Sequence, residues 1–327
     1  MNNNIFNNKF AVAPMLDWTD KHCRYFHRML SKQALLYTEM VVADAIIHGN
    51  KQRFLEFLPI LKPLALQLGG SDPKKLAEAT SIAADYGYDE INLNVGCPSS
   101  RVQSGAFGAC LMLEPQCVQE CVAAMKAVTT IPITVKCRIG VDNQAIESAL
   151  NDLAKHLIAA NVNGFWIHAR KAWLSGLSPK ENRNIPPLNY DRVYKFKFKY
   201  KDYFVGINGG IQNIDEALTH LQKVDAVMVG RAAYKTPMIL TKVDSKIYNK
   251  PSSFSLDDLI ENMCEYANNV VSLGGRLSYI TKHMLGLFVQ QYGAKEWRQD
   301  LTKLATNTEA RGEDLRKIFM KIKKYNQ

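Results

Sequence analysis

The chain has 327 residues and is 47% hydrophobic, enough for a barrel of about 250 residues plus an appendage. No apolar run approaches the roughly 20 residues that cross a bilayer, and Met1 to Asn8 are polar and Asn-rich, unlike a secretory signal. These features exclude a membrane protein and predict a soluble, cytoplasmic protein with reduced thiols. We also expect it to be monomeric.

Cysteine spacing and net charge limit the possible partners. The seven cysteines include no Cys-x-x-Cys and no flanking His pair of the kind that closes a zinc site, so no metal is expected. The 41 Lys and Arg against 31 Asp and Glu give a formal charge of +10, which attracts a polyanion. Many basic proteins bind no nucleic acid, so charge alone does not identify the partner.

Short β-rich apolar segments alternate with helix-period segments from Phe10 to about Tyr248. The apolar segments are FAVAPML (from Phe10), ALLYTEM (from Ala34), PLALQLGG (from Pro63), EINLNVG (from Glu90), PITVKCRIG (from Pro132), GFWIHAR (from Gly164), YFVGING (from Tyr203) and DAVMVGRA (from Asp225). Eight parallel βαβ units of this kind predict a closed (β/α)8 TIM barrel of the α/β class. Helices are expected after Asp72, Glu114 and Gln212, each with a Pro or acidic residue near its start.

The strand signal disappears after Pro251. Ser255 followed by Asp257 and Asp258 is typical of a helix start. Helix breaks are expected at Gly274-Gly275, Gly293 and Gly312. The chain is therefore predicted to divide into a barrel over residues 1–250 and a basic, all-helical domain over residues 251–327.

Polar residues end almost every predicted strand, where barrels carry their active sites. The predicted strand ends carry Met15 and Asp17, Glu39, Gln67, Asn92 and Asn94, Lys136 and Arg138, His168 and Arg170, Asn208, and Gly230 with Arg231. Any one of them alone could be an ordinary residue of the barrel mouth. The whole set predicts an active site there.

The ends of the last two predicted strands are rich in glycine. Asn208-Gly209-Gly210 and Gly230-Arg231 would let backbone amides approach phosphate oxygens, while the Arg adds a charged fork. A Gly-Gly after a strand is by itself only a turn. The two sites together predict a phosphate-bearing cofactor.

Lys136 lies within an otherwise apolar strand, and burying an ammonium is expensive unless an anion compensates it. A reduced flavin offers such an anion, and Gln67 and His168 could hydrogen-bond its other edges. A pair with a barrel carboxylate such as Glu39 and a Schiff-base lysine are the alternatives.

Cys97 lies in a Gly-Cys-Pro loop at the predicted barrel mouth. The glycines around it, including Gly105 and Gly108, suggest a mobile lid. A thiol is mainly protonated at neutral pH, so it can act as a general acid as well as a nucleophile. The three cysteines in or beside the following helix are expected to be apolar filler; they are Cys110, Cys117 and Cys121.

Eight motifs in order along the chain resemble the tRNA-dihydrouridine synthases. They are APMLDWTD from Ala13, LLYTEM from Leu35, LQLGG from Leu66, LNVGCPSSRVQSGAFGACLM from Leu93, VKCRIG from Val135, HARKAWLSGLSPKENRNIPPL from His168, INGGI from Ile207 and MVGRAAY from Met228. The segment from His168 to Leu188 and TKHMLGLF from Thr281 resemble the A-type bacterial subfamily, tRNA-dihydrouridine(20/20a) synthase. The family pattern has an acidic residue where Ser100 stands.

The resemblance implies an FMN-dependent oxidoreductase that uses NADPH to reduce uridine to 5,6-dihydrouridine in the tRNA D-loop, at U20 and U20a. It implies Cys97 as the catalytic acid. The implied FMN-binding residues are Pro14, Met15, Gln67, Lys136, His168, Asn208, Gly209, Gly210, Gly230 and Arg231. The implied substrate contacts are Asn94, Arg138, Lys171, Arg183 and Lys282.

The chemistry accounts for this choice of residues. Hydride from reduced flavin N5 should enter uracil C6, and a thiol on the opposite face of the ring should protonate C5. The base must first leave its stack, at a cost of a few kcal/mol, which basic side chains of the helical domain would offset by holding the RNA.

Several alternatives stay open from the sequence. The run from Tyr194 to Asp202 interleaves aromatic and basic residues, which suits a nucleic-acid surface or an outer helix leading into a strand. Asp17, Trp18 and Asp20 could line an RNA entrance or cap a helix. A small-molecule pyrimidine oxidoreductase related to dihydroorotate dehydrogenases and a non-catalytic RNA-binding protein are the competing functions.

Overall fold

The computed structural model describes residues 7–99, 105–251 and 254–325. Its contacts divide the chain into two compact units. The first comprises Met1–Met15 and Leu35–Gly230, and the second comprises Leu16–Ala34 and Arg231–Gln327. The division thus falls after Gly230 rather than at residue 250, and a segment near the amino end joins the second unit.

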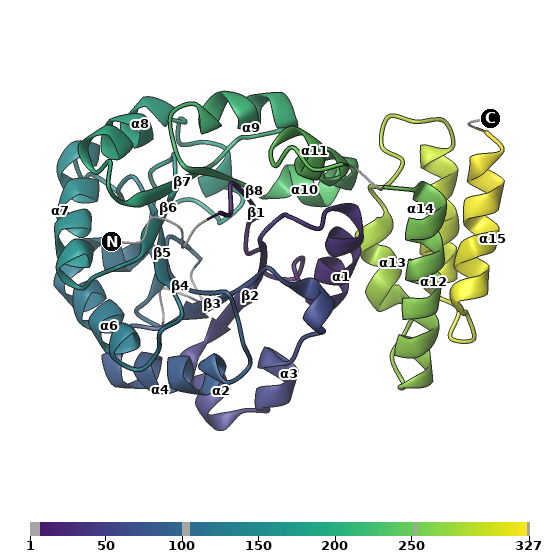
Figure 1. The fold of residues 1–327 in the computed structure, drawn as a ribbon, viewed down its shortest axis with the longest axis horizontal. Coiled ribbons are helices and arrows are strands. Elements are labelled where there is room, and N and C mark those ends of the chain that lie inside the picture. Colours follow the sequence, from purple (N-terminus) through teal and green to yellow (C-terminus); the bar gives the residue numbers. More distant parts are fainter. Residues whose placement is uncertain (1–6, 100–104, 252–253, 326–327) are drawn as a thin grey trace. The chain divides into compact units, whose positions relative to one another are not determined.

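The first unit is a barrel of parallel strands ringed by helices (Figure 1). Its strands are β1 (Phe10–Val12), β2 (Leu36–Val42), β3 (Leu64–Gly69), β4 (Glu90–Val95), β5 (Ile133–Arg138), β6 (Gly164–His168), β7 (Phe204–Asn208) and β8 (Ala226–Val229). The sheet order is β1-β8-β7-β6-β5-β4-β3-β2. A parallel bridge between Ala11 and Leu35, with Val12 N donating to Leu35 O at 2.9 Å, joins β1 to the start of β2. The predicted TIM barrel is confirmed.

Helices and short 3-10 turns connect the strands. They are α2 (Ala43–His48), α3 (Lys51–Leu55), η2 (Pro59–Leu61), α4 (Pro73–Ala84), η3 (Gly108–Leu113), α6 (Pro115–Ala127), α7 (Ile146–Ala159), η4 (Glu181–Arg183), α8 (Tyr190–Lys199) and α9 (Ile214–Leu221). The expected helix after Asp72 is α4. The Asp72 carboxylate caps this helix by accepting hydrogen bonds from the backbone N–H groups of Lys74 and Lys75. The aromatic and basic run begins in α8 and continues into the turn before β7, with Phe196 buried, which confirms the outer-helix interpretation.

The inner face of the barrel is filled by large side chains below the mouth. Tyr37, Trp166, Phe204 and Met228 form one buried cluster. Gly206 is required beside Trp166, because a Cβ at this position would lie 2.1 Å from the indole ring. The barrel is therefore a packed core, and in barrels of this kind the ligand site lies at the carboxyl-terminal end.

The second unit is helical. Its elements are α1 (Lys21–Leu30), α10 (Arg231–Lys235), η5 (Pro237–Lys242), α11 (Val243–Lys246), α12 (Leu256–Ser272), α13 (Ser278–Met284), α14 (Ala294–Leu304) and α15 (Gly312–Lys323). Ser255 accepts a hydrogen bond from Asp258 N at 3.2 Å, so the expected cap of α12 is confirmed. The helix α1 packs against α12, α13 and η5, which explains why residues 16–34 group with the carboxyl-terminal helices.

No helix in the described ranges combines the length and the apolar character that crossing a bilayer requires.

Candidate functional site

The predicted site residues of the barrel converge because they are register partners on neighbouring strands. Asn94 on β4 lies beside Lys136 on β5. Arg138, His168 and Asn208 occupy equivalent positions on β5, β6 and β7. Since partners in a parallel sheet face the same side, these side chains share the carboxyl-terminal end of the barrel.

Three amide side chains form one connected group at this end. Asn94 Nδ2 donates to Gln67 Oε1 at 2.9 Å, and Gln67 Nε2 donates to Asn92 Oδ1 at 2.8 Å. All three side chains are buried, Asn92 completely. Burial of hydrogen-bonded amides holds them in fixed orientations, because any rotation would leave a buried polar atom without a partner.

Asn94 also holds the loop that carries Cys97. Its Oδ1 accepts hydrogen bonds from the backbone N–H groups of Gly96, at 3.1 Å, and Cys97, at 3.0 Å. The half-buried thiol of Cys97 lies 3.5 Å from Ser99 Oγ. The backbone carbonyl of Cys97 accepts a hydrogen bond from Ala109 N at 2.9 Å. Hydrogen bonds on both sides of Cys97 therefore fix the backbone that carries the sulfur. The predicted lid lies partly beyond the described residues, as does the departure at Ser100.

Lys136 points a partly buried ammonium into the same end of the barrel. Burial, together with the nearby charge of Arg138, lowers its pKa to about 8. Within the described residues its ammonium makes one hydrogen bond, to Asn208 Oδ1 at 3.2 Å. The ammonium thereby places a positive charge at this end of the barrel.

Arg138 is buried and bonded to three backbone carbonyls. Its guanidinium donates to the oxygens of Gly96, Lys171 and Asn182, each at 3.0 Å. It thereby ties the Cys97 loop to the loop after β6. Burial lowers the pKa of Arg138 to about 10, and the charges of Arg183 and Arg170 contribute to the same shift. This end of the barrel is thus electropositive, although Arg138 itself is largely occupied by protein.

The other two predicted substrate contacts of the barrel lie after β6. Lys171 Nζ donates to Gln144 O at 2.8 Å and lies 5.7 Å from the centre of the Trp173 ring. Arg183, in η4, is exposed. Both have the reach and the charge for a phosphate, and their contact with substrate stays a prediction.

The glycines after β7 and β8 differ in what the protein itself requires of them. Gly209 and Gly210 have φ angles of 120° and 76°, and a Cβ at Gly210 would lie 2.6 Å from Leu188 Cδ1. A Cβ at Gly230 would meet only Ala13 and Met15, at an ordinary 3.6 Å. The protein has room for a side chain at Gly230, so its absence leaves space for a ligand.

The remaining predicted cofactor residues lie around these glycines or follow them in the chain. Pro14 and Met15 follow β1 and are half-buried, and Met15 packs against the core cluster. Arg231 follows Gly230 directly and begins α10.

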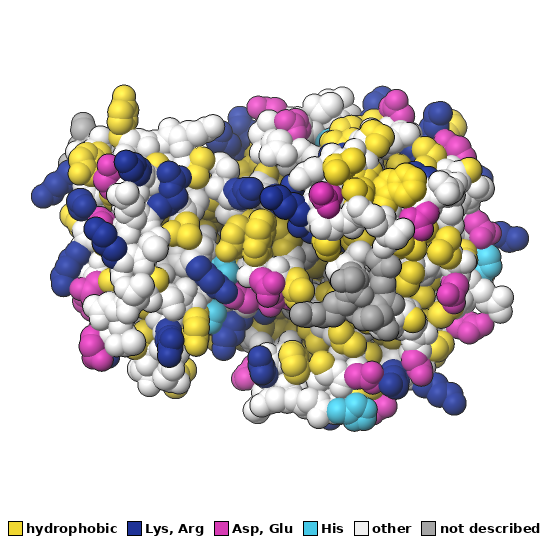
Figure 2. All heavy atoms as spheres, turned by 180° about the vertical axis from the view of Figure 1, so that it is seen from behind, with side chains coloured by type: hydrophobic (Ala, Val, Ile, Leu, Met, Phe, Trp, Pro, Cys, Tyr) yellow, Lys and Arg dark blue, Asp and Glu magenta, His cyan; other side chains and the backbone are white. Residues whose placement is uncertain are grey.

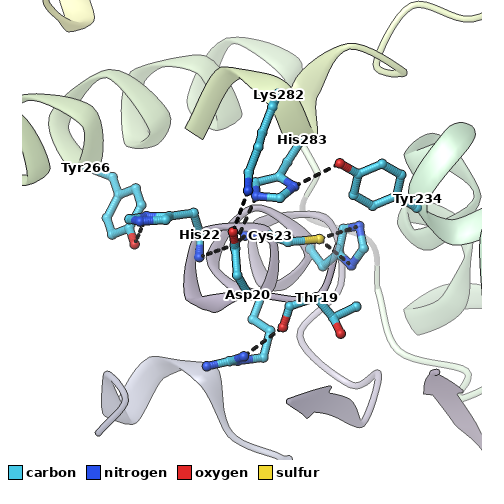
Figure 3. A network of polar contacts seen from close by, with 10 residues as sticks. Thr19, Asp20, His22, Cys23, Tyr234, Tyr266, Lys282 and His283 are labelled. Atoms are coloured by element: carbon cyan, nitrogen blue, oxygen red, sulfur yellow. Dashed lines mark hydrogen bonds and ion pairs between the residues drawn. The ribbon is translucent and has the colours of Figure 1, made fainter. Parts of the chain in front are cut away.

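Lys282 is the exposed member of a polar network within the second unit (Figure 3). Its ammonium lies 2.9 Å from Asp20 Oδ2, and His283 Nε2 lies 2.9 Å from Asp20 Oδ1. Burial alone would raise the pKa of Asp20, but His283, Lys282 and the backbone N–H of Cys23 hold it well below its usual range. Asp20 also accepts from His22 N, so it is the cap of α1, the structural alternative considered for it.

The structure adds two buried polar residues that the strand-end pattern missed. Thr134 lies two residues before Lys136 on β5, and its Oγ1 accepts a hydrogen bond from Asn92 Nδ2 at 2.7 Å. Glu90, at the start of β4, accepts hydrogen bonds from Tyr37, Thr134 and Trp166. The polar residues at every second position of β4 indicate a polar row that includes Glu90, but the predicted site covered only the strand ends.

The side chains at the mouth suit a ligand with an anionic edge. Trp166 and its neighbours close the space below, the Lys136 ammonium offers positive charge, and amide side chains line the side of β3 and β4. A reduced flavin is one ligand with such an edge, and the glycines after β7 and β8 predicted a phosphate-bearing cofactor from the sequence. Among residues 7–99, 105–251 and 254–325, no group of three or more His, Cys, Asp or Glu side chains could hold a metal ion.

Comparison with known proteins agrees with this geometry. The family model described as "Dihydrouridine synthase (Dus)" matches residues 11–324. The chain is 50% identical to tRNA-dihydrouridine(20/20a) synthase of Vibrio parahaemolyticus over 320 residues, 97% of each chain. It is 52% identical to the protein of that name from Shewanella oneidensis, covering 93% of this chain and 92% of the relative. The Synechocystis protein of that name is 50% identical, covering 97% of this chain and 95% of the relative. The chain therefore belongs to the dihydrouridine synthase family.

Proposed function

We propose that this enzyme reduces uridine to 5,6-dihydrouridine in the D-loop of tRNA, at U20 and U20a, with FMN as cofactor and NADPH as electron donor. The observation that carries the proposal is the half-buried Cys97 thiol, held beside an electropositive barrel mouth in a chain about 50% identical to tRNA-dihydrouridine(20/20a) synthases over nearly its full length. That combination supports a thiol as proton donor, a cofactor with an anionic edge and tRNA as substrate.

The residues at the mouth suit the binding of FMN. Lys136 would hold the anionic edge of the ring, and the amide of Gln67 and the imidazole of His168 would contact its other edges. The backbone around Asn208, Gly209, Gly210 and Gly230, followed by Arg231, would take the phosphate. When bound and reduced by NADPH, FMN supplies the hydride that enters uracil C6.

Cys97 would complete the reduction by donating its thiol proton to C5 of the base. Asn94 fixes the backbone of Cys97 by accepting its N–H, so the sulfur is held in place before the substrate arrives. Correct placement of a proton donor contributes to rate through orientation as well as acidity. Asn94 retains an N–H that could also hold the uracil.

The RNA would be held by positive charge. Lys and Arg side chains are spread over the helical unit in Figure 2, and the chain carries a formal charge of +10. We assign tRNA binding to these helices, with Lys282 as one contact, and to Arg138, Lys171 and Arg183 at the barrel. Backbone contacts of this kind recognise the shape of an RNA more than its sequence.

A reconstitution experiment tests the function. The purified protein is loaded with FMN, and NADPH oxidation is followed with tRNA that lacks D-loop dihydrouridine, with free uridine and with orotate. We expect oxidation to be coupled to tRNA alone. Turnover of a free pyrimidine with no turnover of tRNA would establish the small-molecule alternative instead.

A further inference from the structure

The hydrogen bonds behind Cys97 form one continuous chain across three strands. It runs from the backbone N–H of Cys97 to Asn94, then to Gln67 on β3 and back to Asn92 on β4. From there it continues through Thr134 on β5 to the buried carboxyl of Glu90. This chain of hydrogen bonds therefore links the Cys97 loop to Glu90, which lies in the interior of the barrel.

The direction of every bond in this chain follows from its ends. A backbone N–H can only donate, so the atom of Asn94 that faces Gly96 and Cys97 must be the oxygen. Its NH2 then faces Gln67, which must offer its oxygen and turn its own NH2 toward Asn92. The same step at Asn92 directs its NH2 to Thr134 Oγ1, whose hydroxyl hydrogen goes on to Glu90.

Glu90 is suited to end the chain, because its Oε1 accepts from Thr134, Tyr37 and Trp166 at once. A carboxyl oxygen accepts hydrogen bonds in either protonation state. Burial raises the pKa of Glu90 to about 6, and the three donors partly offset that effect. Backbone N–H donors at the Cys97 loop and the carboxyl acceptor of Glu90 in the core therefore impose the same direction on every hydrogen bond between them.

We propose that Glu90, Thr134 and Asn92 are positioning residues that fix the amide orientations of Gln67 and Asn94 and so hold the Cys97 loop in place for protonation of the substrate. The proposal rests on the proposed function for its catalytic meaning. Reversing any one amide would place two oxygens or two NH2 groups against each other in a buried site, so the links set one another's orientation.

Thr134 offers the sharpest test, because Val keeps its shape and lacks the hydroxyl. Thr134→Val removes the acceptor of Asn92 and one donor of Glu90. Thr134→Ser keeps both links and loses only a methyl group. Glu90→Gln keeps an acceptor oxygen and is a second conservative control. Thr134 and Glu90 are both buried below the mouth, so any substitution there could also act through packing. Comparing the three variants separates loss of the hydrogen bonds from loss of packing.

The primary readout is the rate at which iodoacetamide alkylates Cys97 in the FMN-loaded protein, measured by peptide mass spectrometry. The half-buried Cys110 in η3 lies outside the hydrogen-bond chain and serves as the internal reference. In Thr134→Val we expect Cys97 to react roughly fivefold faster, because a loop released by one hydrogen bond opens more often. Cys110 should react at an unchanged rate, and both conservative variants should stay close to wild type.

Kinetics with tRNA give the second readout. We expect kcat of Thr134→Val to fall roughly tenfold with KM for tRNA unchanged, because the variant disturbs the placement of the thiol and not the RNA surface. A folded, FMN-binding Thr134→Val protein with wild-type alkylation and kcat would overturn the proposal. Should that variant not fold, Asn92→Leu breaks the same chain, and wild-type reactivity of Cys97 there would overturn it equally.

The alkylation result stands apart from the proposed function. If wild-type protein made no dihydrouridine, the reaction assigned to this enzyme would be wrong, while the ratio of Cys97 alkylation between Thr134→Val and Thr134→Ser would still decide whether the chain holds the loop.

Discussion

The two sides of the barrel mouth are built in opposite ways. On the side of β3 to β5, Gln67, Asn92 and Asn94 bond to one another and are buried. On the side of β7 and β8, glycines take the place of such side chains, and at Gly230 the protein leaves room that it does not fill. One side holds groups still, and the other leaves space. A site that fixes a thiol and also admits a phosphate, as we propose for this one, needs both.

The largest expected effect comes from the ordered side. Cys97→Ala removes the proposed proton donor, so uridine reduction should slow by at least about 100-fold, the lower end of general-acid contributions. Reduction of bound FMN by NADPH should persist, because that step does not need the thiol. Stopped-flow flavin absorbance and dihydrouridine formation measure the two separately, and normal turnover on tRNA would remove Cys97 from this role.

Lys136 joins the two sides through Asn208, and its substitution sharpens the comparison. Because its pKa is lowered to about 8 from 10.5, the unfolded chain binds more protons between these values, and wild-type stability should rise with pH across that window. Lys136→Met should remove this rise and stabilise the FMN-free protein at pH 7 by about 2 kcal/mol.

The same substitution should weaken FMN binding, since the anionic edge of the ring loses its cation. Thermal unfolding as a function of pH and fluorescence titration with FMN measure the two effects. Lower stability together with unchanged FMN affinity would show that Lys136 serves the fold and not the cofactor.

A pair of glycine substitutions tests the open side. Gly230→Ala should leave stability unchanged and weaken FMN binding roughly tenfold, because its Cβ meets no protein atom closely and would occupy the space for phosphate. Gly210→Ala should destabilise the protein by about 1 kcal/mol or more, because its φ of 76° disfavours a side chain. Equal effects of both substitutions on stability would contradict the proposed difference.

The smallest expected effect lies outside the barrel and should leave both sides of the mouth intact. Lys282→Gln should weaken tRNA binding roughly threefold and reduce the dependence on salt by about one phosphate contact. Lys323→Gln is the matched control, because Lys323 is also paired with a carboxylate, that of Asp257. Filter binding across salt concentrations measures tRNA affinity. Equal losses of affinity in the two variants would show general electrostatic attraction instead of a specific contact by Lys282.

The sequence predicted the barrel because strand and helix periods are local signals, and all eight strands lie where the apolar segments placed them. It also predicted the set of polar strand ends, since parallel strands bring their carboxyl ends together. It could not assign residues 16–34 to the helical unit, because that grouping depends on how α1 packs. The alternation of polar residues along β4 pointed to Glu90, but its hydrogen bond with Thr134 depends on how β4 and β5 pair, which the sequence does not show.

The central claim is tested most directly by mapping dihydrouridine in tRNA by mass spectrometry after incubation with the enzyme, FMN and NADPH. The account predicts that uridines 20 and 20a of the D-loop gain two hydrogen atoms each, and only when all three components are present. Unmodified uridines at both positions, or the same gain without FMN, would contradict it.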